Sequence, residues 1–373
     1  MANRNVDGAI AGTGADGANS QSETSGRSRR EFLTTLAAFG LASVAPAGKL
    51  FAQADASSTK RGLIDVHHHV VPPFFIAENR DQIIAAGGGR MNPAYLNWTP
   101  EQSLATMDKY GVEIAVLSLS VSAYWFGDAK AAARTARRVN EYIADLVRNH
   151  PQRFGLFAII PLPDTEASLR EIDYAFGALK ADGIGLATSY DEKWLGNPDY
   201  QPVFEELNRR KAVVFVHPTT PMSCRTLMPD VSPMLMEIPQ DTARAVTNMV
   251  FTGTFAKFQD IRFIFAHAGG NVPMVLGRMH QYGPKNIAEK APNGIEYELN
   301  RHYYDIAGTA YRPAIAALKS LVPTTQIVFG SDDPFVPLAD TAEGVMKVGF
   351  SADELASIGR SNALTLLPRL KTI

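Results

Sequence analysis

The sequence predicts a single-domain (β/α)8 barrel of the metal-dependent hydrolase type, with eight parallel strands that are each followed by a helix. Two observations support this fold: short aliphatic runs alternate with longer helical patterns, and polar side chains follow several of the runs. The eight runs are Leu63–Val66, Ile114–Leu119, Gly155–Ile160, Gly183–Leu186, Val213–Val216, Arg262–Ala266, Tyr303–Ile306 and Gln326–Phe329. Val213–Val216 and Phe263–Ala266 are continuous apolar runs, as expected for strands that are buried on both faces.

Segments with apolar residues at spacings of three and four lie between these runs, which predicts helices. They are Pro100–Tyr110, Ala129–Arg148, Glu166–Lys180, Tyr200–Arg210, Thr242–Phe255 and Pro313–Leu321. Thr99, Pro100 and Glu101 form a typical helix start. Two segments, Val71–Asn97 and Pro218–Pro239, are predicted to be loops over the barrel mouth. A Rossmann sheet is the alternative fold, but histidines replace its glycine fingerprint after the first strand.

Residues 1–54 are predicted to be a disordered leader with an export signal, and residues 55–373 to be the barrel. The beginning of the chain is rich in Gly, Ala, Asn and Ser, and it lacks the large apolar side chains of a core. Arg29, Arg30, the apolar stretch Leu33–Val44 and a small-residue site ending at Ala54 are typical of a twin-arginine signal. Cleavage there would give a periplasmic protein that starts at Asp55. The alternative is an amphipathic helix that is retained.

Composition limits the kinds of partner. The formal net charge of -2 gives no electrostatic reason to expect nucleic acid or an anionic membrane as partner. The apolar run of the leader is too short to cross a bilayer comfortably, so no membrane span is expected in the mature form. Cys224 is the only cysteine, which excludes an intrachain disulfide and a thiolate metal cluster. We interpret it as a loop or packing residue.

Metal-binding side chains follow four of the predicted strands. They are His67 and His69 after the first run, His217 after the fifth, His267 after the sixth and Asp332 after the eighth. The C-terminal ends of the strands carry the active site in barrels of this kind. Alternate residues of a strand share a face, so His67 and His69 point together and His68 points away. Imidazoles with a carboxylate suit Zn²⁺, Mn²⁺ or Fe²⁺ and leave a position open for water or substrate.

These motifs resemble the amidohydrolase superfamily. The resemblance covers about Leu63 to Leu370 and is carried by H-x-H, the single His217, His-Ala-Gly-Gly from His267 and Gly-Ser-Asp-Asp-Pro around Asp332. Within the superfamily, the chain looks like the branch of aminocarboxymuconate-semialdehyde-type decarboxylases. The order of its segments is most similar to that of 6-methylsalicylate decarboxylases.

The resemblance implies a role for each of these residues. One divalent ion, with zinc expected and manganese the alternative, would be held by His67, His69, His217 and Asp332. His267 would be the catalytic histidine, and Asp332 would also take part in catalysis. One ion is expected because the branch lacks the bridging lysine of two-metal relatives, and the fourth strand here contains no lysine.

A substrate-binding role for Arg278 is also implied. It follows His267 by eleven residues, where branch members carry an arginine that reaches the site of a neighbouring subunit and holds the substrate carboxylate. This predicts a homodimer or a larger assembly. The alternative is an ordinary surface arginine on a helix.

Two positions depart from the pattern of the branch. Ser103 stands where the aminocarboxymuconate enzymes carry a second substrate arginine. A second carboxylate would therefore lose its partner, which favours an aromatic mono-acid as substrate. Asp333 stands where an aromatic residue is usual. It either raises the pKa of its neighbour through like-charge repulsion or caps the next helix.

The predicted activity is that of a carboxy-lyase: non-oxidative decarboxylation of a small aromatic acid such as an o-hydroxybenzoate or 6-methylsalicylate. In one route, hydroxide adds to the substrate with the help of His267. In the favoured route, carboxylate and phenol oxygens bind the metal, and Asp332 or His267 protonates the ring carbon. A metal-dependent hydrolase of an amide, lactone or ester is the main alternative, and a hydratase is another. A periplasmic binding protein is disfavoured, because a binder needs no His267 beside the metal and usually has two lobes.

Overall fold

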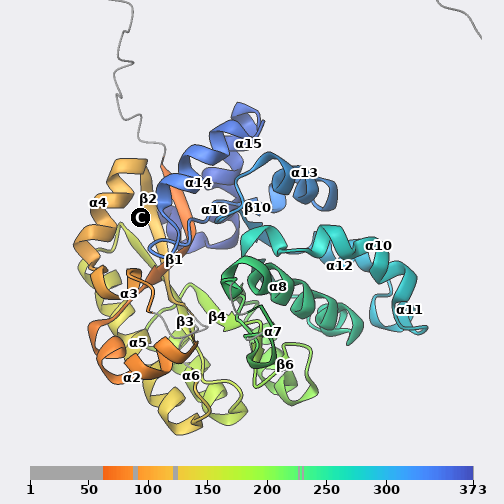
Figure 1. Ribbon diagram of the computed structural model, residues 1–373, viewed down its shortest axis with the longest axis horizontal. Helices are drawn as coiled ribbons and strands as arrows, with labels where there is room; N and C mark the ends of the chain where they lie inside the picture. The colour runs from red at the N-terminus through yellow and green to blue at the C-terminus, as the bar shows by residue number, and fades with distance from the viewer. Residues whose placement is uncertain (1–61, 87–90, 121–124, 226, 229–230, 373) are drawn as a thin grey trace, which may run out of the picture. The chain divides into compact units, whose positions relative to one another are not determined.

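The computed structural model describes residues 62–86, 91–120, 125–225, 227–228 and 231–372 (Figure 1). The predicted leader, with its export signal and cleavage after Ala54, lies outside the described residues and stays a prediction. Within the described ranges, no helix is both long enough and apolar enough to span a bilayer.

Eight parallel strands form one sheet. In spatial order they are β1 (Leu63–Val70), β2 (Val112–Leu119), β3 (Phe154–Ile159), β4 (Gly183–Ala187), β7 (Val213–His217), β8 (Arg262–Phe265), β9 (Tyr303–Asp305) and β10 (Ile327–Val328). The sheet closes between its first and last strands. There the N–H of Val66 donates to the carbonyl of Phe329 at 3.1 Å, and the N–H of His69 donates to that of Asp333 at 2.8 Å. The predicted barrel and its eight strands are confirmed.

Helices surround the strands in chain order, from orange α4 through yellow α5, green α7 and α8 and teal α10 to blue α13–α16 (Figure 1). The longer helices are α2 (Pro73–Ala86), α4 (Pro100–Tyr110), α5 (Ala129–Asn149), α6 (Thr165–Gly177), α7 (Gln201–Arg209), α8 (Pro233–Phe251), α10 (Val272–Tyr282), α13 (Arg312–Leu321) and α14 (Leu338–Gly344). The shorter ones are α3 (Ala94–Asn97), α9 (Thr254–Lys257), α11 (Ile287–Lys290), α12 (Ile295–Asn300), α15 (Ala352–Ala356) and α16 (Asn362–Leu366). A small antiparallel hairpin, β5 (Ser189–Tyr190) and β6 (Lys193–Trp194), follows β4.

The apolar runs bury both faces of the strands. In β7, Val213 and Phe215 belong to one apolar cluster with residues of the neighbouring strands, whereas Val214 and Val216 belong to a second cluster that includes the helices. Adjacent side chains of a strand point to opposite faces, so each face of β7 supplies one of the two clusters. This double burial explains why β7 is a nearly continuous apolar run.

The predicted start of the helix after the first loop is confirmed. The hydroxyl of Thr99 accepts a hydrogen bond from the N–H of Gln102 at 3.2 Å, and Pro100 occupies the first helical turn of α4. Gly111 ends the helix in the left-handed region, with φ of 74°, which a residue without a side chain adopts without strain. The chain then enters β2 directly.

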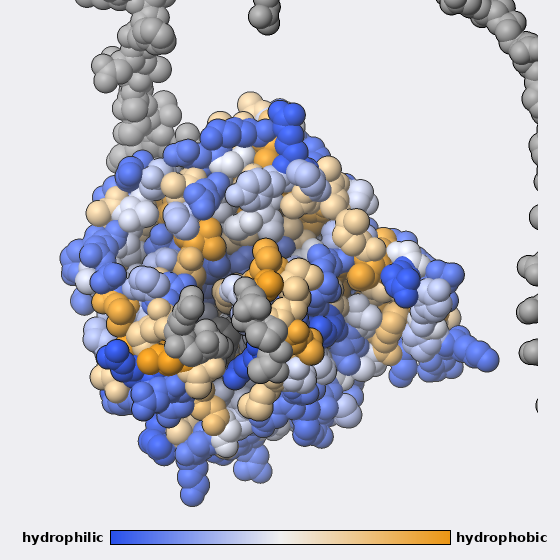
Figure 2. Space-filling model, viewed as in Figure 1, coloured by the Kyte–Doolittle hydropathy of each residue, from blue (hydrophilic) through white to orange (hydrophobic). Residues whose placement is uncertain are grey.

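Both segments predicted as loops over the mouth are partly helical, so that prediction was wrong in part. Val71–Asn97 contains α2 and α3, and α8 begins at Pro233, well before Thr242. Pro239 is tolerated inside α8. The carbonyl of Pro239 accepts a hydrogen bond from the N–H of Asn271 at 3.2 Å. The face shown in Figure 2 carries apolar patches around a hollow, in a mainly hydrophilic surface.

Candidate metal centre

The C-terminal ends of β1, β7, β8 and β10 bring the five predicted side chains together. The Nε2 atoms of His67 and His69 are 3.1 Å apart. Asp332 Oδ1 lies 3.3 Å from His67 Nε2, 3.0 Å from His69 Nε2 and 3.9 Å from His217 Nε2. His267 Nε2 is 3.9 Å from the other carboxylate oxygen, Oδ2 of Asp332. Each of these four imidazoles therefore turns its Nε2 toward Asp332.

The other ring nitrogen of each histidine is held from outside the cluster. Nδ1 of His67 contacts Asp305 Oδ2 at 2.9 Å, and Nδ1 of His69 contacts the Ser118 hydroxyl at 3.2 Å. Nδ1 of His217 contacts the Pro218 carbonyl at 2.8 Å, and Nδ1 of His267 contacts the Ala307 carbonyl at 3.0 Å. A carbonyl or carboxylate oxygen can only accept, so Nδ1 of His67, His217 and His267 is the donor. Their Nε2 lone pairs then face the centre, the usual arrangement of histidine ligands.

Two orphaned atoms show that a cation fits this cluster. Within the described ranges, His217 Nε2 and Asp332 Oδ1 are buried and have no hydrogen-bond partner. Leaving such atoms unpaired is costly, and a divalent ion bound by nitrogen and oxygen donors would satisfy both. Ligand atoms of His67, His217, His267 and Asp332 all lie within 4.8 Å of one another, so these three histidines and one aspartate form a metal-binding site.

Both His69 and His267 lie close enough to the centre to bind the ion, so the distances alone do not decide which is a ligand and which is the catalytic residue. His69 contacts both His67 and Asp332 closely, as expected of a ligand. His267 is also within reach of the centre, although the sequence predicted that it acts on protons. The assignment of His69 as ligand and His267 as catalytic residue stays a prediction.

The electrostatics of the site favour neutral imidazoles around an ionised carboxylate. Burial would raise the pKa of Asp332, but the charge of His67 and the other imidazoles close to the carboxylate hold it well below its usual range. Burial lowers the pKa of His217 to about 4 and also lowers that of His267. His67 is the exception: burial opposes its charge, yet Asp305 and Asp332 raise its pKa to about 10. A bound ion would take the place of that proton.

Two residues of the centre have left-handed backbones. His267 has φ of 56° and Asp332 has φ of 67°, a region that costs energy for residues with side chains. The N–H of His267 donates to Asp305 Oδ1 at 3.0 Å, and that of Asp332 donates to the His67 carbonyl at 2.7 Å. These bonds offset the strain and aim both side chains at the cluster.

His68 points away from the centre, as predicted. Its Nδ1 contacts Asp65 Oδ2 at 3.0 Å, and its Nε2 lies 2.6 Å from the hydroxyl of Ser103 on α4. Ser103 is thus buried against His68. Asp333 lies 3.6 Å from His68 Nε2. Pro337 precedes α14 and forms no side-chain capping hydrogen bond there, so the two roles considered for Asp333 stay predictions.

Three residues of the site, Asp305, Tyr95 and Phe335, were not predicted. Asp305 ends β9 and holds His67. The available signal was an acidic residue at the end of an apolar run. Tyr95 belongs to α3, and its ring lies 4.9 Å from that of Phe335, which in turn lies 5.4 Å from His69. Burial and the charge of Asp332 raise the pKa of Tyr95 to about 12, so its hydroxyl keeps its proton. These two rings form an aromatic wall beside the centre.

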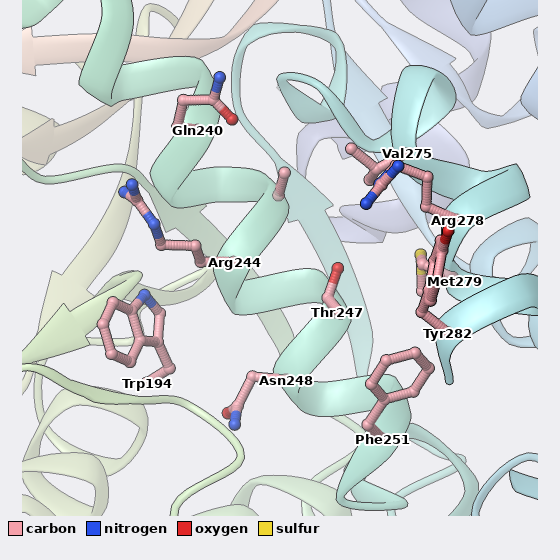
Figure 3. A pocket seen from close by; sticks show the side chains of 11 residues that line it. Trp194, Gln240, Arg244, Thr247, Asn248, Phe251, Val275, Arg278, Met279 and Tyr282 are labelled. Atoms are coloured by element: carbon pink, nitrogen blue, oxygen red, sulfur yellow. The ribbon is translucent and has the colours of Figure 1, made fainter. Parts of the chain in front are cut away.

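Arg278 lies apart from these contacts. It is on α10 in a groove formed with α8, where Val275, Met279 and Tyr282 face Thr247 and Phe251 (Figure 3). Its guanidinium lies 4.8 Å from the centre of the Tyr282 ring and forms no ion pair within the described ranges. The predicted role of Arg278 in the active site requires a second subunit, and it stays a prediction.

The fold and the site together define a metal-dependent barrel enzyme. A family model described as Amidohydrolase matches residues 64–369. The relatives include decarboxylase yanB of Aspergillus niger, which is 34% identical over 83% of this chain and 88% of its own. The 6-methylsalicylic acid decarboxylase acuB of Aspergillus aculeatus is 31% identical over 83% of this chain and 96% of its own. The chain belongs to the amidohydrolase family, in its branch of carboxy-lyases.

Solved structures confirm the fold. The 5-carboxyvanillate decarboxylase LigW from Sphingomonas paucimobilis superposes with a TM-score of 0.71 at 21% identity, over 82% of this chain and 98% of its own. A dihydroxybenzoic acid decarboxylase from Polaromonas sp. JS666, with bound manganese and an inhibitor, gives the same TM-score at 21% identity, over 82% of this chain and 97% of its own. At this identity the likeness concerns the fold alone.

Proposed function

We propose that the protein is a metal-dependent, non-oxidative decarboxylase of a small aromatic acid, an o-hydroxybenzoate of the 6-methylsalicylate kind. The observation that carries the proposal is the cluster of four imidazoles around Asp332, next to the aromatic wall of Tyr95 and Phe335. The wall suits an aromatic ring. Two 6-methylsalicylic acid decarboxylases, 31% and 30% identical over 83% of this chain, support the substrate class.

One divalent ion is part of the proposal. The nitrogen and oxygen donors suit zinc, which the sequence favours. The manganese bound in the decarboxylase from Polaromonas supports manganese as the alternative. When bound, the ion would act as a Lewis acid toward the carboxylate and phenol oxygens of the substrate. His67, His69, His217 and Asp332 would hold it.

In this proposal, side chains of the protein carry out the proton transfer. His267 is fixed through its Nδ1 by the Ala307 carbonyl, so Nε2 is the atom that gains and gives a proton. Burial lowers the pKa of His267, which makes its protonated form a ready donor. In the proposed step, protonated His267 gives a proton to the ring carbon that bears the carboxylate; Asp332, which is ionised, would have to take up a proton before it could do the same. The carbon–carbon bond then breaks, its electrons restore the aromatic ring, and CO₂ leaves.

The proposal is tested with protein that starts at Asp55, loaded with one ion and incubated with a panel of hydroxybenzoates including 6-methylsalicylate. We expect CO₂ and the corresponding phenol to form in equal amounts, and a chelator to stop both. Metal analysis of the active preparation identifies the ion. A fully loaded protein that releases no CO₂ from any member of the panel would contradict the proposal. Amides and lactones would then test the hydrolase alternative.

We also propose that the active form is a homodimer in which Arg278 serves the site of its partner. An unpaired guanidinium in a groove that is open to a second molecule supports this. The Arg278→Ala variant should lose activity as a pure dimer. Mixed with His267→Asn it should recover about a quarter of the wild-type rate, because half of the dimers are hybrids with one complete site. No recovery in hybrids shown to form would reject the shared site.

A periplasmic location, reached by the twin-arginine route, is proposed from the leader. Its support is the order of the arginine pair, the apolar stretch Leu33–Val44 and the small-residue site at Ala54. The exported protein should begin at Asp55, which N-terminal mass spectrometry can check. A full-length N-terminus on protein from the periplasmic fraction would contradict cleavage after Ala54.

A further inference from the structure

Asp241 is a buried carboxylate that has no part in the proposed chemistry. It lies on α8, and its side chain is 0% exposed. Four donors from three segments surround it: the Thr188 hydroxyl, the Trp194 ring N–H at 2.9 Å, the Thr219 N–H at 3.3 Å and the Thr219 hydroxyl at 3.1 Å. Thr188 follows β4, Trp194 ends the β5–β6 hairpin, and Thr219 follows β7. Asp241 therefore ties together three segments at the site end of the barrel.

One of these donors belongs to the peptide unit that orients His217. The carbonyl of Pro218 accepts the hydrogen bond from His217 Nδ1 at 2.8 Å. The N–H of the same peptide unit is that of Thr219, which donates to Asp241 Oδ2 at 3.3 Å and to the Thr188 hydroxyl at 3.1 Å. A peptide unit is planar, so anchoring its N–H also sets the direction of its carbonyl.

Thr188 strengthens the same arrangement. Its N–H donates to the His217 carbonyl at 3.1 Å, and its hydroxyl donates to Asp241 Oδ2. The turn from His217 to Thr219 is thus held at both ends by Thr188, and Asp241 holds Thr188 in place. Removing the carboxylate would release both threonine hydroxyls and one anchor of the peptide unit together.

We propose that Asp241 is a positioning residue for His217, which fixes the peptide unit whose carbonyl orients the imidazole toward the metal centre. The inference rests on the proposed function only in taking His217 as a ligand. It would place a determinant of metal affinity on α8, two hydrogen bonds away from His217.

The charge of Asp241 is balanced mainly by neutral donors. The cation near it in the described part of the chain is Arg244, whose Nη1 is 3.9 Å from Oδ1 and also lies 3.3 Å from Glu237. Trp194 and Arg244 lie on the same side of α8 (Figure 3). Burial raises the pKa of Asp241, and its hydrogen bonds oppose that rise. The buried carboxylate is therefore stabilised mainly by its hydrogen-bond donors. Because those bonds are directional, they hold the donor groups in fixed positions, as a positioning role requires.

The test compares Asp241→Ala and Asp241→Asn with the wild type, using Co²⁺ alone as the probe. We expect Asp241→Ala to weaken Co²⁺ binding about tenfold, the lower end of the range for residues that support metal ligands. Competition with a chelator measures the affinity, and the visible spectrum of the bound Co²⁺ reports a change in ligand geometry. The Co²⁺ affinity of Asp241→Asn should lie between those of the wild type and Asp241→Ala, because its amide oxygen still accepts some of the hydrogen bonds.

Glu237→Ala is the matched control. Glu237 lies one turn earlier on α8, is nearly buried and contacts Arg244 on the same helix. It should bind Co²⁺ like the wild type, with the same spectrum, even if the melting temperature falls. Wild-type Co²⁺ affinity and an unchanged spectrum in a folded Asp241→Ala variant would overturn the inference. Asp241 would then have a purely structural role.

A second variant covers the case in which Asp241→Ala does not fold. Thr188→Val removes one hydroxyl that bridges Asp241 and the Thr219 N–H, and it should weaken Co²⁺ binding severalfold with an altered spectrum. Wild-type affinity and spectrum in this variant would count against the inference. A wild-type protein that binds no Co²⁺ would instead reject the proposed metal centre, so the two failures are distinguishable.

Discussion

Replacing His267 by Asn is expected to lower the rate of decarboxylation by a factor of about 10² to 10⁴, the range typical of a lost acid–base group, while the protein keeps its ion. An amide can still donate to the Ala307 carbonyl, as His267 Nδ1 does at 3.0 Å. It cannot carry a proton to the substrate. The ion should remain because the four proposed ligands, His67, His69, His217 and Asp332, are unchanged in this variant.

The measurements are kcat with 6-methylsalicylate and the metal content of the purified variant. His280→Asn is the control, because His280 is an exposed histidine that contacts Glu296 at 2.7 Å, and its loss should change neither quantity. Loss of the ion together with activity would make His267 a ligand. Its Nε2, 3.9 Å from Asp332 Oδ2, is close enough for that outcome to be a real alternative.

Replacing Asp305 by Ala is expected to weaken metal binding by about 10- to 100-fold, as found for residues that hold histidine ligands from behind. Asp305 Oδ2 contacts His67 Nδ1 at 2.9 Å and fixes the direction of the ring. Its Oδ1 accepts the N–H of His267 at 3.0 Å and that of Ala307 at 2.9 Å. The substitution therefore releases a metal ligand and the strained backbone of His267 together.

Metal affinity is measured by chelator competition, alongside thermal unfolding. Asp182→Ala is the control, because Asp182 is also a buried aspartate but precedes β4 at the opposite end of the strands, where it pairs with Arg369 at 2.6 Å. It should lower the melting temperature and leave metal affinity unchanged. Wild-type affinity in a folded Asp305→Ala variant would contradict the prediction and show that the centre does not need the Asp305 carboxylate.

The strands and the position of the active site could be predicted from the sequence for a physical reason. A strand buried on both faces must be apolar along its length, so polar residues such as His217 and Asp332 stand out at its end. A closed parallel barrel brings these ends together, so residues distant in sequence, such as His67 and Asp332, converge. The start of α4 was also readable, because a cap such as Thr99 acts through its immediate neighbours.

The loops were less readable. Val71–Asn97 was predicted to be a loop because of its Gly87-Gly88-Gly89, and the weak helical periodicity of α2 did not correct this, so the aromatic wall at Tyr95 was missed. The helix α8 begins at Pro233 in a segment whose prolines and methionines suggest irregular structure. In both places, contacts with the rest of the barrel outweigh weak local preferences.

The sequence by itself determined the barrel, the metal-ligand types and their convergence, because each follows from local pattern and strand topology. The tertiary structure alone decided which residues support the ligands. Asp305 contacts His67 across 238 positions, and Asp241 reaches the turn after His217 from the middle of a helix. Asp241 looks like any other aspartate in its segment, and Asp305 is marked only by its place at the end of an apolar run. Their roles arise only when folding removes them from water and leaves a ligand or its peptide unit as their hydrogen-bond partner.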